Sequence, residues 1–319
     1  MTITLALAGD TMLGRGVAER LGAESPQKLV SDEIVEIVRG ADLFVLNLEC
    51  CVSERGRPWA APGKPFFFRA PPAAIDLLVR LGVDCVTLAN NHALDYGPDA
   101  LADTFEHLSS AGVEFVGAGT DLRRARAPAV LEAAGFRMAV LGITDHPADF
   151  AASPEDPGVA FVDLEAGLPE WVAATVGEHG ADGILVTPHW GPNMVAEPVP
   201  SVRAAARSLV EQGATLVAGH SAHVFHGAAD RVLFDLGDFL DDYAVDPVLR
   251  NDLGLLWLVD LDEQGPVRVE AVPLELDYCF TGVATGEDLG WIERRFAGAC
   301  RALGTEVTWA AGRAIIELR

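Results

Sequence analysis

The stretch Val83-Asp84-Cys85-Val86-Thr87-Leu88-Ala89 runs directly into Asn90-Asn91-His92-Ala93-Leu94-Asp95-Tyr96-Gly97. The first seven residues are mostly apolar and have the length of a buried β-strand. The next eight carry two amides, an imidazole and a carboxylate, which seldom gather at a strand end for packing reasons alone. Open α/β sheets place their active sites outside the carboxyl ends of their strands. We therefore expect His92 and Asp95 to belong to a functional site.

The composition indicates a globular protein whose negative charge disfavours binding to polyanions. The chain has 319 residues, of which 50% are hydrophobic, and this is enough for a sizeable core. Its 47 acidic residues against 23 basic ones give a formal net charge of -24. Such a charge repels nucleic acid and anionic membrane surfaces, so we expect neither as a partner. Divalent metals and neutral or cationic partners fit better.

The cysteines and the amino terminus predict the compartment. The five cysteines show no CxxC spacing, and an odd number does not suggest a disulfide framework. The first residues, Met1 to Ala8, lack a basic region and are typical of a first strand rather than of a signal peptide. No apolar segment approaches the length of a membrane span. We expect a soluble, unanchored protein in a reducing cytoplasm.

Alternating apolar and amphipathic segments predict an α/β protein. Strands are expected at residues 4–8, 43–47, 83–89, 113–116, 138–143, 184–187 and 215–218, and helices at 72–81, 98–111, 165–177 and 202–212. After about Arg231 the apolar runs lack long helices until residues 287–303, which suggests a second sheet packed on the first. We expect one domain over residues 1–319, with catalytic motifs within residues 9–227 and C-terminal sheet and helix elements in residues 231–319.

Five strand ends carry groups that bind metals or move protons, and their recurrence matters more than any one of them. They hold Asp10; Glu49; Asn91, His92 and Asp95; His189 with Trp190; and His220, His223 and His226. A carboxylate at the end of an apolar strand is costly unless it is paired or bound to metal. Histidines this dense suggest metal ligands or acid–base groups. Of the last three, His226 is the best candidate for a structural role.

Several other polar groups leave two interpretations open. The acidic stretch Asp235 to Tyr243 either supplies a carboxylate that orients a histidine or forms a solvated turn. The stretch Lys64 to Arg69 sets cations among aromatic residues, which suits a carboxylate-bearing apolar ligand or a packed loop. The remaining histidines, His107, His146 and His179, lack polar companions, and we expect them to be structural.

Taken in order, the five strand ends resemble the CapA-like (poly-γ-glutamate synthesis) family, a branch of the calcineurin-like metallophosphoesterase fold. The resemblance covers about residues 1–245 and lies in Gly-Asp at Asp10, Asn-Leu-Glu at Glu49, Asn-Asn-His at His92 with Asp95, His-Trp-Gly at His189, and Gly-His-x-x-His at His220 and His223. It implies an α/β fold in which a two-layer β-sandwich is flanked by helices.

The sequence departs from the two-metal pattern of that fold. The pattern begins Asp-x-His, whereas Asp10 is followed by Thr11 and Met12; it has an aspartate where Glu49 stands; and its last histidines are separated by one residue rather than two. A single divalent metal is the simpler hypothesis, and the resemblance implies the ligands Asp10, Glu49, the carbonyl of Asn91, His189 and His220. Oxygen donors favour Ca²⁺ or Mn²⁺, with Mg²⁺ possible and Zn²⁺ less suited.

Three functions fit these residues. The first is that of a CapA-like metallophosphoesterase or other hydrolase, or of a polyglutamate-related enzyme, with His92, oriented by Asp95, protonating the leaving group. The second is peptide epimerisation, because the family is also similar to epimerases of lasso-peptide biosynthesis. The third is a binding module that kept the fold and lost the chemistry.

We favour the epimerase hypothesis, because the negative charge of the chain and the missing metal ligand argue against a phosphate-bearing substrate. Inverting an α-carbon requires a base on one face and an acid on the other. His92 with Asp95 is one such pair, and His220 or His223 with a nearby carboxylate is the other. Arg15, Arg69 and Trp190 are expected to hold the ribosomal precursor peptide that would be the substrate.

Overall fold

Strand β1 (Ile3–Thr11) lies at the centre of the molecule and sends its side chains to two different cores. The computed structural model describes residues 2–23, 29–60, 63–178 and 180–318. Leu5 and Leu7 enter a core between two β-sheets, whereas Ala6 and Ala8 enter a core between the first sheet and its covering helices. This alternation is the two-residue period of a strand buried on both faces.

The first sheet has ten strands and is mixed in direction. Its order is β19 (Thr308–Ala310), β20 (Arg313–Glu317), β17 (Gly265–Asp277), β16 (Leu253–Asp262), β1, β2 (Leu43–Leu48), β5 (Cys85–Thr87) and β6 (Glu114–Val116), with β15 (Asp238–Leu240) paired to β1 and β18 (Phe280–Val283) paired to β17. The strands β1, β2, β5 and β6 are parallel, so their carboxyl ends lie at one edge. Strand β16 runs antiparallel to β1.

The second sheet has six strands. Its order is β13 (Ala228–Ala229), β14 (Val232–Leu233), β12 (Leu216–Ala218), β11 (Gly183–His189), β9 (Phe136–Thr144) and β8 (Ala129–Ala133). Strands β9, β11, β12 and β14 are parallel. Two short pairs complete the strands: β3 (Cys51–Val52) with β4 (Arg69–Ala70), and β7 (Ala118–Gly119) with β10 (Gly158–Val159).

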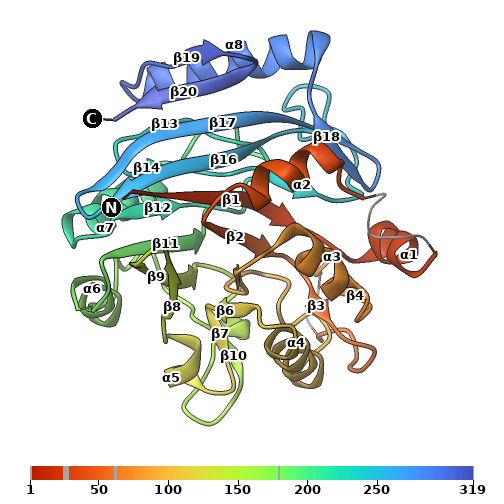
Figure 1. Ribbon diagram of the computed structural model, residues 1–319. Helices are drawn as coiled ribbons and strands as arrows, with labels where there is room; N and C mark the ends of the chain where they lie inside the picture. The colour runs from red at the N-terminus through yellow and green to blue at the C-terminus, as the bar shows by residue number, and fades with distance from the viewer. Residues whose placement is uncertain (1, 24–28, 61–62, 179, 319) are drawn as a thin grey trace.

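Helices cover the outer faces of both sheets (Figure 1). Helices α1 (Arg15–Ala23), α2 (Asp32–Arg39), α3 (Ala74–Leu81) and α4 (Pro98–Ser110) pack on the first sheet, and α6 (Glu170–Gly177) and α7 (Pro200–Glu211) on the second. Helix α8 (Gly286–Ala302) adds Ile292 and Phe296 to the core between the sheets. The short helices α5 (Leu122–Ala125) and η2 (Ala148–Phe150) lie in connections.

The expectation for the residues after Arg231 was wrong in one respect. Strands β16 and β17 do not form a second sheet; they extend the first, because β16 pairs with β1 over residues 253–262. The second sheet is built earlier in the chain, from residues 129–233. The sequence pattern did not predict α1 and α2. It predicted a helix over residues 165–177, whereas α6 begins only at Glu170.

No helix in the described part of the chain is long and apolar enough to cross a membrane. The five cysteines are buried and form no disulfide. The cytoplasmic location stays a prediction.

Gly9 determines how closely β1 approaches the loop before β15, and we predict that Gly9→Ala is strongly destabilising. A Cβ atom at Gly9 would lie 1.7 Å from the backbone oxygen of Gly237, which also accepts the Asp10 N–H. Backbone cannot yield as a side chain can, so we expect a loss of about 2 kcal/mol or more in unfolding free energy. Chemical denaturation measures it.

The matched control is Gly298→Ala in the middle of α8, where a Cβ atom meets nothing within 4 Å. There alanine should stabilise the helix by about 0.5–1 kcal/mol. Equal stability of the Gly9→Ala variant and the original protein would contradict the close approach of β1 and this loop.

Candidate metal centre

Asp10 lies at the end of β1 with its carboxylate enclosed by polar groups from both sheets. It is 1% exposed. The Asn47 amide donates to its Oδ1 at 2.7 Å, and the Ser221 backbone N–H approaches its Oδ2 at 3.3 Å. The Nδ1 atoms of His220 and His223 each lie 3.4 Å from one of the two oxygens. The first and fifth strand ends of the sequence therefore meet at this carboxylate.

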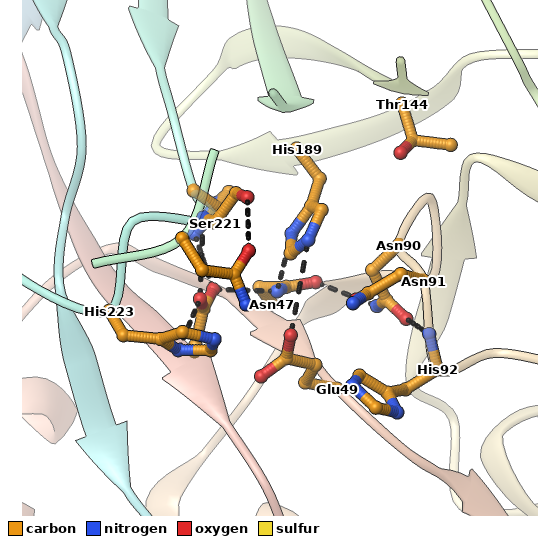
Figure 2. A network of polar contacts seen from close by, with 12 residues as sticks. Asn47, Glu49, Asn90, Asn91, His92, Thr144, His189, Ser221 and His223 are labelled. Atoms are coloured by element: carbon orange, nitrogen blue, oxygen red, sulfur yellow. Dashed lines mark hydrogen bonds and ion pairs between the residues drawn. The ribbon is translucent and has the colours of Figure 1, made fainter. Parts of the chain in front are cut away.

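Glu49 and His189 form the other side of the cluster, as Figure 2 shows. Glu49 follows β2 and His189 ends β11, so the two residues come from different sheets. The Glu49 Oε1 atom lies 3.9 Å from His189 Nε2, and Glu49 Oε2 accepts a hydrogen bond from the Tyr243 hydroxyl at 3.2 Å. Donor atoms of Asp10, Glu49 and His189 all lie within 4.8 Å of one another.

Buried donor atoms without hydrogen-bond partners converge at this cluster. They are Glu49 Oε1, Asn91 Oδ1, His189 Nε2 and His220 Nδ1. The backbone carbonyl of Asn91 accepts from Lys64 Nζ at 2.8 Å, so its side-chain oxygen is the atom left for a ligand. Buried polar atoms nearly always have a hydrogen-bond partner, and those that lack one in the protein usually contact an ion or a water molecule. With Asp10 they make three oxygen and two nitrogen donors, a set that fits a divalent cation.

The charges of the cluster are unbalanced without a cation. Burial, together with the nearby Asp10 carboxylate, raises the pKa of Glu49 well above its usual range. Burial lowers the pKa of His189 well below its usual range. Burial also raises the pKa of Asp10, but the neighbouring imidazoles, that of His220 foremost, outweigh it and hold that pKa below normal. A bound cation would favour ionised Glu49 and neutral His189, which are the ligating forms.

His92 and Asp95 form a tight pair beside this cluster. His92 Nδ1 lies 2.6 Å from Asp95 Oδ2, and the His92 ring stacks on Phe68 at 4.0 Å between ring centroids. Lys64 Nζ lies 3.0 Å from the other Asp95 oxygen. Burial lowers the pKa of His92. The imidazole is thus held by its Nδ1 edge, and no hydrogen bond from the described residues occupies its Nε2, which can exchange a proton with a substrate.

Asn90 and Asn47 connect the pair to the cluster. The Asn90 amide donates to Asn47 Oδ1 and to the Leu48 carbonyl, both at 2.9 Å, and its own oxygen accepts the His92 N–H at 3.0 Å. Asn47 in turn donates to Asp10. Asn47 was not predicted to belong to the site, although its place one residue before the end of β2 was a usable signal.

A second histidine–aspartate pair is formed by His223 and Asp238. His223 Nδ1 lies 2.9 Å from Asp238 Oδ1, and these residues with Asp10 are a second group that could hold a metal. Burial, together with the nearby Asp241 carboxylate, raises the pKa of Asp238 well above its usual range. The acidic stretch from Asp235 to Tyr243 thus provides a carboxylate for a histidine. Which carboxylate pairs with the histidine could not be predicted from the sequence, and neither could the contact of Tyr243 with Glu49.

A cavity of about 330 Å³ opens beside both pairs. Its lining includes His92, His223, Arg15, Phe66, Tyr243 and Met194. The Arg15 guanidinium is bound to Asp242 and lies 5.4–5.7 Å from three aromatic ring centroids, those of Phe66, Phe68 and Tyr243. Of the three residues expected to hold substrate, only Arg15 lies in this lining.

The structure places the other two expected substrate residues elsewhere. Arg69 stacks on Tyr96 at 4.2 Å and donates to the Arg55 carbonyl. Trp190 is 3% exposed in the core of the second sheet and donates its indole N–H to Phe234. Both were expected at the site because they adjoin its motifs, but strand alternation and turn geometry direct them away.

The four remaining histidines have different surroundings. His226 Nε2 donates a hydrogen bond to the Val195 carbonyl at 2.8 Å, a structural contact. His107 lies on α4, and His179 lies outside the described residues. His146 was expected to lack polar companions, and this was wrong, because its Nδ1 is paired with Asp145.

Comparison with known proteins identifies the family. Residues 4–243 match the family described as "Bacterial capsule synthesis protein PGA_cap". The chain belongs to this family. The CapA-like resemblance and the calcineurin-like sandwich with flanking helices are therefore confirmed, whereas a role in lasso-peptide epimerisation is not shown.

Similar proteins extend over most of the chain. A probable polyglutamine synthesis accessory protein of Mycobacterium tuberculosis is 28% identical, over 96% of this chain and 93% of that protein. The capsule biosynthesis protein CapA of Bacillus anthracis is also 28% identical, over 86% and 67%. The crystal structure of a hypothetical protein from Thermus thermophilus aligns with a TM-score of 0.50 and 16% identity, over 86% of this chain and 99% of that one. At this identity the likeness is evidence for a common fold only.

Tyr243 gives a test of the metal centre, because its hydroxyl donates to Glu49 and its ring packs on His223 at 5.2 Å. We predict that Tyr243→Phe weakens binding of Mn²⁺ by about tenfold, since groups that orient a ligand typically contribute 10- to 100-fold. Isothermal titration calorimetry measures the affinity.

Tyr278→Phe is the control, because Tyr278 is 56% exposed and lies outside the cluster. Its affinity for Mn²⁺ should equal that of the original protein. An unchanged affinity in Tyr243→Phe would mean that Glu49 is not a ligand or needs no orientation.

Proposed function

We propose that this protein is a metal-dependent hydrolase that cleaves a phosphoester. The observation that carries the proposal is the position of the His92–Asp95 pair next to a cluster of unpartnered metal-type donors. His92 lines a cavity together with His223 and Tyr243, which contact the cluster at Asp10 and Glu49. The membership in a metallophosphoesterase-like fold family supports it, since that fold hosts this chemistry on metal donors at strand ends. The names of the relatives suggest that such a hydrolase serves the assembly of a cell-surface polymer.

The cation would be held by Asp10, Glu49, His189 and His220 and the side-chain oxygen of Asn91. It would supply Lewis-acid polarisation of a phosphoryl oxygen and offset the negative charge that develops there. With three oxygen donors we propose Mn²⁺ or Ca²⁺ before Mg²⁺, and Zn²⁺ last. We propose one cation rather than two, because His223 Nδ1 is already paired with Asp238 Oδ1.

Water is the second reactant and attacks phosphorus as the bond to the ester oxygen breaks, and the chain's own residues act on that departing oxygen. Asp95 accepts a hydrogen bond from Nδ1–H of His92, so that protonated His92 can give its Nε2 proton to the departing oxygen. Lys64 forms an ion pair with Asp95 and donates a hydrogen bond to the Asn91 carbonyl. It thereby holds the partner of the proposed acid and the proposed metal ligand Asn91 in fixed relative positions. Arg15, whose charge is paired with Asp242, lines the cavity, and Phe66 and Phe68 provide an apolar wall.

Peptide epimerisation remains a second candidate on one specific observation. His92 and His223 both line the same cavity, and each is held at Nδ1 by a buried aspartate. Two oriented imidazoles facing one space are the acid and base that inversion of an α-carbon requires. The histidine of this second pair would be His223 rather than His220, because the lining of the cavity contains His223 and not His220. A precursor peptide would then be the substrate.

We predict that His92→Ala lowers the rate of hydrolysis of p-nitrophenyl phosphate by about 10²- to 10⁴-fold, the usual contribution of a general acid. This leaving group is a good one, so the effect should be at the lower end. Metal content, measured by inductively coupled plasma mass spectrometry, should stay the same, because His92 belongs to neither donor group. Removal of the metal with EDTA should abolish turnover in the original protein.

His107→Ala is the control for His92→Ala, because His107 lies on α4 away from the cavity. It should retain full activity and metal. Wild-type protein that is loaded with Mn²⁺ and turns over no phosphoester at all would refute the proposed hydrolase.

A deuterium experiment separates the two candidates. We predict that incubation of the metal-loaded protein with candidate peptides in D₂O leaves every α-carbon unlabelled, since hydrolysis breaks no carbon–hydrogen bond. Mass spectrometry detects the label. Deuterium at a single α-carbon that disappears in His223→Ala would instead establish the epimerase and overturn the hydrolase.

A further inference from the structure

A series of stacked rings runs from His92 to the solvent-exposed part of the cavity. The His92 ring stacks on Phe68 at 4.0 Å between centroids and an angle of 28°, and Phe68 stacks on Phe66 at 6.4 Å and 17°. Phe68 is 2% exposed, whereas Phe66 is 55% exposed. All three residues line the cavity of about 330 Å³. The proposed acid therefore borders a space with an aromatic wall.

Two further apolar side chains line the same cavity. The Tyr243 ring lies 5.8 Å from that of Phe68, and Met194 is 37% exposed. The Met194 backbone N–H donates to the Ala222 carbonyl at 3.0 Å, which fixes this part of the lining. Single exposed apolar residues are common on protein surfaces, but Phe66 and Met194 gather at one cavity. Such gathering is typical of a site that binds an apolar group.

The permanent positive charge in this lining is already paired. Arg15 lies 2.6 Å from Asp242 Oδ1 through one guanidinium nitrogen and donates to Oδ2 through Nε at 3.2 Å. Its guanidinium also lies 5.5 Å from the Phe66 ring centroid. A guanidinium bound in this way directs its charge to the carboxylate and its planar face to aromatic rings. The lining therefore favours an uncharged group over an anionic one.

His92 determines which part of the substrate meets this lining. In the proposed hydrolysis, His92 gives its proton to the departing oxygen, so the group attached to that oxygen must occupy space that His92 borders. That space is the cavity. Its volume is at the lower end of the range of about 300–1,000 Å³ that is usual for ligand pockets, which suits a small leaving group.

We propose that this cavity binds the leaving group of the substrate and selects phosphoesters whose leaving group is uncharged and carries an apolar ring. Phe66 is the residue that determines this specificity, because its exposed ring is available for stacking. The inference rests on the proposed hydrolase and adds its substrate class. A contact remote from phosphorus forms equally in the ground state and the transition state, so its loss raises KM and leaves kcat unchanged.

The test compares 3-phenylpropyl phosphate with n-propyl phosphate on protein loaded with Mn²⁺, because the two esters release similar alkoxides and differ by the ring. We expect the original protein to prefer the phenyl ester by about tenfold or more in kcat/KM. Phe66→Ala should raise KM for the phenyl ester by about 5- to 10-fold at unchanged kcat, and change kcat/KM for the propyl ester by less than about twofold. Phe66→Leu, which stays apolar, should keep part of the preference.

Tyr278→Ala is the matched control, because Tyr278 is 56% exposed and lines a different cavity. It should equal the original protein on both esters. The charged analogue 3-(4-carboxyphenyl)propyl phosphate should be a poorer substrate than the phenyl ester, since Arg15 is paired with Asp242. Binding without turnover is measured with the alcohols by saturation-transfer NMR. 3-Phenylpropan-1-ol should bind more tightly than n-propanol, and Phe66→Ala should remove most of that difference.

Four results would overturn the proposal. Equal losses on both esters would mean that Phe66 acts on His92 through Phe68, and unchanged constants for both would leave Phe66 without a role. Preference for the carboxylate analogue would mean that Arg15 binds an anion, and equal binding of the two alcohols would mean that the cavity does not recognise a ring. Original protein that hydrolyses neither ester nor p-nitrophenyl phosphate would refute the proposed hydrolase itself. That failure is distinguishable, because it is seen without any variant, whereas the alcohols report on the cavity without turnover.

Discussion

The buried carboxylate of Asp10 is the constraint on which the rest of the site depends. It lies at the centre of the molecule, 1% exposed, with the polar ends of both sheets arranged around it. An ionised carboxylate in such a place is expensive unless charges and hydrogen bonds compensate it. Asn47 and two imidazoles provide part of that compensation, and the unpartnered atoms of Glu49 and His189 show what is still required. A divalent cation supplies the remainder.

The chain can place Asp10 there because the two sheets converge at their carboxyl edges. Strands β1 and β2 deliver Asp10 and Glu49 from one sheet, while β11 and β12 deliver His189 and His220 from the other. Gly9 and Gly237 permit the close contact that lets the Asp10 N–H reach a backbone carbonyl. The apolar core between the sheets thus fixes the distance between donors that lie far apart in the sequence.

Sequence patterns were informative where a residue's position follows from strand geometry. Asp10, Glu49, His92 and His189 end apolar runs, and parallel strands bring such ends together, so their proximity could be inferred without a structure. Asp238 could not be chosen among its acidic neighbours, because the turn that aims it at His223 depends on pairing between β15 and β1. The extension of the first sheet by β16 was missed because an apolar run does not specify its partner strand.

The direction of a side chain just after a strand end was the other feature that could not be predicted from the sequence. Trp190 and His189 are adjacent, yet one enters the core and the other the site, as alternation requires. His146 was dismissed for lacking a polar companion, although Asp145 precedes it directly. Adjacent residues can pair when the chain turns sharply after a strand, as it does here.

The contacts of the two cationic side chains near the cavity, Lys64 and Arg15, bear on how an acidic protein can bind an anionic substrate. Lys64 is occupied by Asp95 and the Asn91 carbonyl, and Arg15 by Asp242, so neither brings an unopposed positive charge to the cavity. Glu49 and Asp238 add potential negative charge beside it. Attraction for a phosphoryl group must then come mainly from the cation held by the Asp10 cluster. Metal and substrate binding are coupled in this arrangement, because the donors that create the metal site would repel the substrate when the metal is absent.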